Sequence, residues 1–201
     1  LVELFKILNL KNFINLTEKT FLKEIFRFLF PEFTNLNRLD RLKKILNYSK
    51  INLNLLLATL LIDKDSNHEY FCHKYNVSND IKDDLNLLAK NLMLLQNNKD
   101  FFTKDIEKYI YLNDKSHLIN LNILNFASNS EYSFKNFSEA MKNILKSKKH
   151  KFHIDGKYLM NKGMSEGVLL GKVLRKIEEE WMENNFKISD DRVHEIIKQN
   201  S

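Results

Sequence analysis

The sequence predicts an all-α fold, with a multi-helix body followed by a smaller helical tail. Only four glycines and one proline occur in 201 residues, which leaves few positions for the turns of a β architecture. Apolar residues recur at spacings of three and four along most of the chain, the period of a helix with one buried face. No alternating strand pattern extends beyond a few residues. Hydrophobic residues make up 43% of the chain, enough for a sizeable core.

The first half of the chain holds six predicted helices. They cover residues 1–10, 20–30, 36–48, 51–62, 69–75 and 80–96. The first has Leu1, Leu4, Phe5 and Leu8 on one face. Pro31 ends the second helix, because proline cannot continue a helical hydrogen-bond ladder. The fourth is apolar nearly all round, which predicts a buried central helix.

Ser78 is the predicted N-cap of the sixth helix, with acidic residues following near the positive end of the helix dipole. The second half holds four further predicted helices, at residues 103–112, 116–127, 139–146 and 168–183. Ser138 is expected to open the third of these, and residues 147–162 are expected to be irregular. The last helix carries an apolar stripe, Leu170, Val173, Leu174, Ile177 and Trp181.

The polar stretch 97–100 is the best boundary between two helical regions. We therefore expect a helical body with an RNA-binding role at residues 1–97, and a helical tail with a basic RNA-contacting segment at residues 98–201.

The net charge of +6 is concentrated in one segment. Residues 141–176 hold ten basic residues, and only Asp155 and Glu166 oppose them, which gives +8 there and −2 for the rest of the chain. Aromatic residues and glycines interleave with the lysines, as in a surface that binds a polyanion. The alternative is that these lysines only solubilise a loop.

The predicted RNA-binding residues lie in or next to this segment. They are Lys146, Lys148, Lys149, Lys151, Lys157, Lys162, Gly167, Gly171, Lys172, Arg175 and Lys176. The two glycines permit close approach of either another helix or a phosphate to the start of the last helix. No base-reading motif is visible, so recognition by shape and backbone is expected.

Other polar clusters have simpler interpretations. His68, Cys72 and His73 lie on one predicted helix, and the first two share a face, but a fourth ligand is missing, so no metal site is predicted. The pair Asp63 and Asp65 lacks the glycine-rich turn and β scaffold that metal-dependent nucleotidyl transfer needs, which favours a solvated turn. The acidic run from Glu178 to Glu183 is expected to be a solvated face. No catalytic residue is predicted.

Cysteine usage and hydropathy favour a cytoplasmic protein without a membrane segment. Cys72 is the only cysteine, which excludes a disulfide within the chain. No signal peptide is apparent in residues 1–10. The longest apolar run, residues 55–62, is far shorter than the roughly 20 residues that span a bilayer.

The run from Ile154 to Phe186 resembles the end of the class II tRNA nucleotidyltransferase (CCA-adding) and bacterial poly(A) polymerase family. The matching positions are Gly156, Leu159, Met160, Gly163, Gly167, Gly171, Leu174, Glu178, Trp181 and Phe186. The segments around Phe30-Pro31-Glu32 and Ser78-Asn79 are similar to helices of the family's body. Ser165 and Val168 replace the two prolines of the family's helix start.

This resemblance implies the part of the enzyme that holds RNA, most specifically the acceptor arm of tRNA. The family's catalytic head would precede residue 1, and Mg²⁺ and nucleotide would belong to that missing head, so the chain is expected to be inactive alone. Two alternatives remain open. The chain is a subunit completed in trans by a separately encoded head, or it is a degenerate helical remnant with an interaction role.

Overall fold

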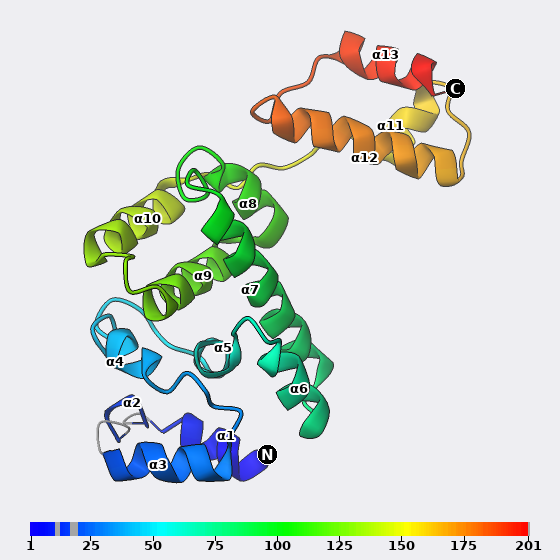
Figure 1. The fold of residues 1–201 in the computed structure, drawn as a ribbon. Coiled ribbons are helices and arrows are strands. Elements are labelled where there is room, and N and C mark those ends of the chain that lie inside the picture. The colour runs from blue at the N-terminus through cyan, green and yellow to red at the C-terminus, as the bar shows by residue number, and fades with distance from the viewer. Residues whose placement is uncertain (11–12, 17–19, 201) are drawn as a thin grey trace. The chain divides into compact units, whose positions relative to one another are not determined.

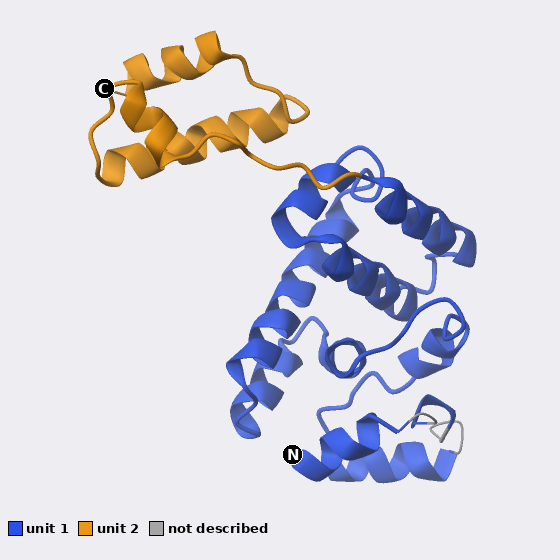
Figure 2. Ribbon diagram, turned by 180° about the vertical axis from the view of Figure 1, so that it is seen from behind, with its two compact units in different colours: residues 1–147 blue, residues 148–201 orange. Residues whose placement is uncertain are grey.

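The computed structural model describes residues 1–10, 13–16 and 20–200. Within these ranges the chain consists of α-helices joined by turns, without a β-strand, which confirms the predicted all-α class (Figure 1). The chain divides into two compact units, unit 1 at Leu1–Ser147 and unit 2 at Lys148–Ser201 (Figure 2). Each unit has a hydrophobic core of its own.

Unit 1 contains the first ten helices of the described ranges. They are α1 (Val2–Leu8), α2 (Phe13–Leu16), α3 (Thr20–Leu29), α4 (Arg38–Lys43), α5 (Leu53–Leu61), α6 (Asn67–Lys74), α7 (Asn79–Asn97), α8 (Ile106–Asn113), α9 (Lys115–Ser128) and α10 (Phe134–Lys146). All residues of α5 from Leu55 to Leu61 are buried, as predicted for the central helix. Helix α9 packs against α4, α5, α7, α8 and α10 and so organises the core of this unit.

The half-buried side chain of Arg41 connects several elements of unit 1. Arg41 of α4 donates from Nε to the Phe126 carbonyl at 2.6 Å and from Nη2 to the Tyr132 carbonyl at 2.7 Å. Its guanidinium also lies over the Phe126 ring, 4.5 Å from the centroid. Arg41 therefore fastens α4 to the end of α9 and the turn that follows it.

Unit 2 contains three helices, α11 (Gly156–Asn161), α12 (Val168–Glu183) and α13 (Asp190–Gln199). Their apolar faces meet in a small core that includes Leu159, Val173, Ile177 and Ile196. Asp155 caps α11 by accepting a hydrogen bond from the Tyr158 N–H at 2.8 Å. The apolar stripe predicted for 168–183 is the face of α12 that this core buries, with Leu170 and Leu174 at its edge.

Several local predictions differ from the structure. Helix α10 begins at Phe134, because Ser133 accepts a hydrogen bond from the Asn136 N–H at 3.1 Å; Ser138 lies inside the helix. Helix α11 occupies part of the segment predicted to be irregular, and α2 and α13 were not predicted. Ser78 is the N-cap residue of α7 as expected, but its side chain makes no capping hydrogen bond.

The compact units divide at a different position from the two predicted regions. Asn97 is the last residue of α7, and the helices that follow it, α8 to α10, continue the core of unit 1 through α9. The boundary of the units therefore lies between Ser147 and Lys148. None of the helices in the described ranges has both the length and the apolar character of a bilayer-spanning segment.

Candidate nucleic-acid interface

The eleven predicted RNA-binding residues are all exposed. Lys146 is the last residue of α10 in unit 1, and the other ten belong to unit 2. Within unit 2 they occupy three places: the entry segment 148–151, helix α11 with the residue after it, and α12 up to Lys176 with its preceding turn.

Charge in unit 2 is divided along the chain. Residues 148–176 hold eight basic and two acidic residues, whereas residues 177–201 hold three basic and seven acidic residues. Helix α12 crosses this division, with Lys172, Arg175 and Lys176 exposed before Ile177 and with Glu179 and Glu183 exposed after it. At 1.5 Å per residue, the centres of the basic group and the acidic group lie roughly 10 Å apart along the helix.

The three cations of α12 follow the first turn of the helix. The partial positive charge of a helix N-terminus is confined to that first turn, so these cations extend the positive region beyond it. Lys172, Arg175 and Lys176 make no ion pair with any other residue in the described ranges. Such an arrangement is suited to an external anion such as a phosphate.

The glycines of this region differ in their backbone angles and in their surroundings. Gly163 and Gly167 have φ values of +97° and +149°, which other residues rarely adopt. Gly171 is helical and open, because a Cβ built on it would meet no atom within 4 Å. Close packing occurs instead at Gly156, where a Cβ would lie 3.3 Å from Leu170 Cδ2. Within unit 2, helix packing therefore does not explain Gly171, and phosphate contact there stays a prediction.

An aromatic cluster fastens the basic entry segment to the end of α12. The His150 ring stacks on Phe186 with centroids 3.8 Å apart and planes inclined by 8°. The ring centroids of Phe152 and Trp181 are 5.1 Å apart, and those of Trp181 and Phe186 are 4.9 Å apart in an edge-on arrangement. Phe186 has a φ of +59°, an uncommon conformation for a bulky residue. The lysines around His150 are thus positioned beside the end of α12, not beside its basic start.

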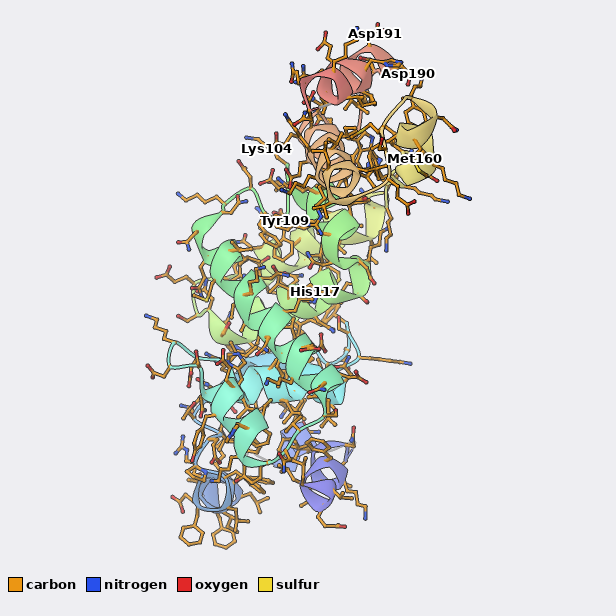
Figure 3. All side chains as sticks on the ribbon, turned by 90° about the vertical axis from the view of Figure 1, so that its right-hand side faces the viewer. Lys104, Tyr109, His117, Met160, Asp190 and Asp191 are labelled. Atoms are coloured by element: carbon orange, nitrogen blue, oxygen red, sulfur yellow. The ribbon has the colours of Figure 1, made fainter. Side chains whose placement is uncertain are left out.

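Helix α13 is joined to the other two helices of unit 2 by polar contacts. The Tyr158 hydroxyl donates to Asp190 Oδ1 at 3.0 Å, and Asp190 stands with Asp191 at the start of α13 (Figure 3). Lys162 Nζ lies 3.1 Å from His194 Nε2. Lys162 is therefore directed to α13, unlike the cations of α12. Sequence reasoning missed His150 and α13, although Ser189 followed by two aspartates is a helix-start signal.

Two other polar clusters singled out in the sequence lie in unit 1. Asp63 Oδ1 accepts hydrogen bonds from the N–H groups of Asp65 at 3.0 Å and Asn67 at 3.2 Å, which confirms the predicted turn. His68 and Cys72 are both buried on α6. Burial lowers the pKa of His68 and raises the pKa of the Cys72 thiol. No group of three His, Cys, Asp or Glu residues in the described ranges is arranged to hold a metal ion.

Comparison with known proteins gives one match. Residues 48–197 match the model of the family described as tRNA nucleotidyltransferase domain 2, which covers most of unit 1 and nearly all of unit 2. No curated protein matches the chain, and no solved structure does.

Proposed function

This chain belongs to the tRNA nucleotidyltransferase domain 2 family, and from this premise we propose that it binds RNA, specifically the acceptor arm of tRNA. The observation that carries the proposal is the exposed basic start of α12. Lys172, Arg175 and Lys176 have no ion-pair partner in the described ranges, and the open Gly171 lies among them.

The chemistry of these residues favours recognition of the RNA backbone. A lysine ammonium is a compact charge that attracts phosphate without the fixed two-pronged geometry of arginine. Contacts to phosphate position a protein on RNA but carry no sequence information. The basic start of α12, together with the lysines of α11 and the entry segment, would therefore hold structured RNA by its shape and charge.

The proposal assigns binding to this chain and nucleotide addition to a catalytic head. Mg²⁺ and the incoming nucleotide would be bound by that head, and the cytoplasm is the compartment we expect for the complex with tRNA. The residues of this chain would hold the acceptor arm while its 3′ end is extended.

Binding can be tested by retention of radiolabelled tRNA on filters at two salt concentrations. We expect retention at low salt and steep loss at high salt, because each phosphate contact releases counterions. An unlabelled acceptor-arm minihelix should compete. No retention at low salt, or retention that does not respond to salt, would contradict the proposal.

A matched pair of variants localises the interface. Lys172→Glu combined with Lys176→Glu should reduce tRNA affinity at least tenfold, because two favourable phosphate contacts become repulsive. Lys187→Glu combined with Lys198→Glu makes the same change of charge at exposed positions outside the predicted set. The second pair should retain most of the affinity. Equal losses would show that net charge alone decides binding.

A further inference from the structure

A cleft of about 850 Å³ opens in unit 1, and none of the predicted RNA-binding residues lines it. Five elements form it: the start of α4, the turn after α5, helix α6, helix α7 from Asn86 onward, and the last residue of α9. We call it the α6–α7 cleft. Its volume lies within the range of about 300–1,000 Å³ that is usual for small-molecule sites.

Two residues that line this cleft have buried polar atoms without a partner. His68 Nδ1 and Asn86 Oδ1 make no hydrogen bond with any residue in the described ranges. Only 4% of His68 is exposed, and burial lowers the pKa of its imidazole, which keeps the ring neutral. Unpaired buried polar groups are costly and uncommon. A ligand with a polar edge could supply the missing partners at this wall.

Three basic side chains line the cleft. Within the described ranges, Arg38 donates hydrogen bonds only from Nη1. The acceptors are the Thr59 carbonyl at 3.2 Å and the Ile62 carbonyl at 2.6 Å. Its Nε and Nη2 therefore have no hydrogen-bond partner there. Lys64 and Lys90 also line the cleft, are exposed, and make no ion pair with the rest of the described chain.

Burial lowers the pKa of Arg38, and the negative charge of Asp63 partly opposes this effect, so the acidic residues of the cleft offset its cations only in part. Both oxygens of the Asp63 carboxylate are engaged, one by backbone N–H groups of its own turn and the other by the Thr34 hydroxyl at 3.3 Å. Glu69 is exposed on α6. Three basic and two acidic side chains give the lining of the cleft a net positive charge, which favours binding of an anionic group. Among the basic side chains, arginine is well suited to phosphate.

Apolar residues line a further part of the cleft. Ile62 and Leu92 are buried beside the cleft, and Ala89 is half-buried. Met93 lines it as well, yet 66% of this side chain is exposed. A thioether makes favourable contacts with aromatic rings. An exposed methionine beside unpaired polar groups and cations offers a surface for a flat ring that carries a phosphate.

We propose that the α6–α7 cleft binds a nucleotide, with the base against Met93 and the His68–Asn86 wall and the phosphate at Arg38, Lys64 and Lys90. The nucleotide is either free or a unit of a bound RNA chain. Only the second source rests on the proposed RNA-binding function. No residue of the basic segment 141–176 lines the cleft, so the two sites can be tested with separate variants.

Methyl NMR of methionine gives a direct readout, because the chain has only five methionines. Met93 is the one that lines this cleft. Titration with AMP should move the Met93 methyl resonance in a saturable way and leave Met160 and Met182 of unit 2 in place. Ribose 5-phosphate and inorganic phosphate should move it much less. An equal response to inorganic phosphate would overturn the proposal, because it would show an anion site without base recognition.

A charge variant with a matched control tests the phosphate end. Lys90→Glu should weaken AMP binding about five- to tenfold, the usual range for loss of a charge-assisted contact. Lys82→Glu makes the same change on the exposed surface of α7 outside the cleft and should have little effect. Both variants should keep the far-UV circular dichroism of the parent. Equal affinities in the two variants would refute the assignment of Lys90.

Two further measurements distinguish a free nucleotide from a nucleotide unit of RNA, and they distinguish failure of this proposal from failure of the proposed RNA-binding function. A short single-stranded RNA that moves Met93 more strongly than AMP identifies a unit of RNA, and a response to AMP alone identifies a free nucleotide. If neither ligand moves Met93, the cleft is not a nucleotide site. The Lys172→Glu, Lys176→Glu variant should lose tRNA retention and keep the AMP response, so failure of one site leaves the other result intact.

Discussion

Arg192 of α13 donates two parallel hydrogen bonds to the carboxylate of Glu180 of α12. Nε donates to Oε1 at 2.6 Å, and Nη2 donates to Oε2 at 3.0 Å. The third guanidinium nitrogen, Nη1, donates to Glu195 Oε2 at 2.8 Å. The fork of an arginine matches a carboxylate in this way, whereas a lysine offers one point charge. This contact fixes α13 on α12 and so completes the small core of unit 2.

Arg192→Lys should therefore lower the unfolding midpoint of unit 2. Trp181 is the only tryptophan and lies in α12, so its fluorescence during urea denaturation reports on this unit. Lys187→Arg, an exchange at an exposed position, is the control. An unchanged midpoint in Arg192→Lys would show that the apolar core alone holds α13.

The same contact predicts a response to acid. The hydrogen bonds from Arg192 lower the pKa of Glu180 below its ordinary value of 4.5. A carboxylate with a lowered folded-state pKa stabilises the fold above its ordinary value, and this contribution is lost as the pH falls through the folded-state pKa. Below about pH 4.5, the urea midpoint measured by Trp181 fluorescence should decline less steeply in Glu180→Gln than in the parent. A decline of the same steepness in this variant would assign it to other carboxylates.

Gly171 and Gly167 should respond to alanine with opposite signs. Gly171→Ala should raise the free energy of unfolding by about 0.5–1 kcal/mol, because the helix gains propensity and the Cβ meets open space. Gly167→Ala should lower it by about 1–3 kcal/mol, because alanine is strained at the backbone angles of Gly167. Trp181 fluorescence in urea measures both changes. Loss of stability in Gly171→Ala would show that a neighbouring element packs on this position.

The glycine at 171 also tests phosphate contact. If RNA phosphate approaches the α12 backbone there, Gly171→Ala should weaken tRNA retention on filters while it stabilises the unit. A variant that is more stable and binds with unchanged affinity would limit the interface to the cationic side chains.

His117 should make unit 1 sensitive to mild acid. It lies in the interior of this unit (Figure 3), and its Nε2 is 2.8 Å from Asn91 Nδ2. Burial lowers the pKa of His117 below its ordinary value of 6.5, an effect that Asp84 and Asp114 partly oppose. The unfolded chain therefore binds a proton more readily than the folded one. The free energy of unfolding should fall as the pH drops from about 7 to about 5.

This pH effect can be measured by urea denaturation followed by far-UV circular dichroism. His117→Gln keeps a hydrogen-bonding group beside Asn91 and removes the titration, so its stability should depend less on pH. His68 would supply the remaining dependence, since burial lowers its pKa as well. His73→Gln, at an exposed position on α6, should behave like the parent. An identical pH dependence in His117→Gln would contradict the assignment.

Most helices were predictable because amphipathic periodicity is a local property of the sequence. The continuous apolar character of 51–62 correctly placed α5 in the core. The stripe of 168–183 correctly gave α12 and its buried face. Short helices were missed where a single cap decides them. Asp155 and Ser189 start α11 and α13 through one side-chain hydrogen bond each, and such residues also occur in turns.

The family and the candidate interface differ in how far the sequence determined them. The glycine and tryptophan pattern between Ile154 and Phe186 indicated the family, and the match over residues 48–197 shows it. The exposure of the eleven residues agrees with the predicted interface, whose role in binding stays a prediction. The sequence did not reveal that Lys162 is directed to His194, or that His150 fastens the entry segment to Phe186.

By itself, the sequence determined the all-α class, the buried helix α5, the family and the basic segment, since each depends on residue types and short spacings. Tertiary structure alone decided which polar groups are used within the fold. Arg41 and Arg192 are bound to carbonyls and carboxylates of distant segments, whereas Arg175 has no ion-pair partner in the described ranges. The partner of a long side chain depends on elements that packing brings to it, and spacing along the chain does not encode that packing.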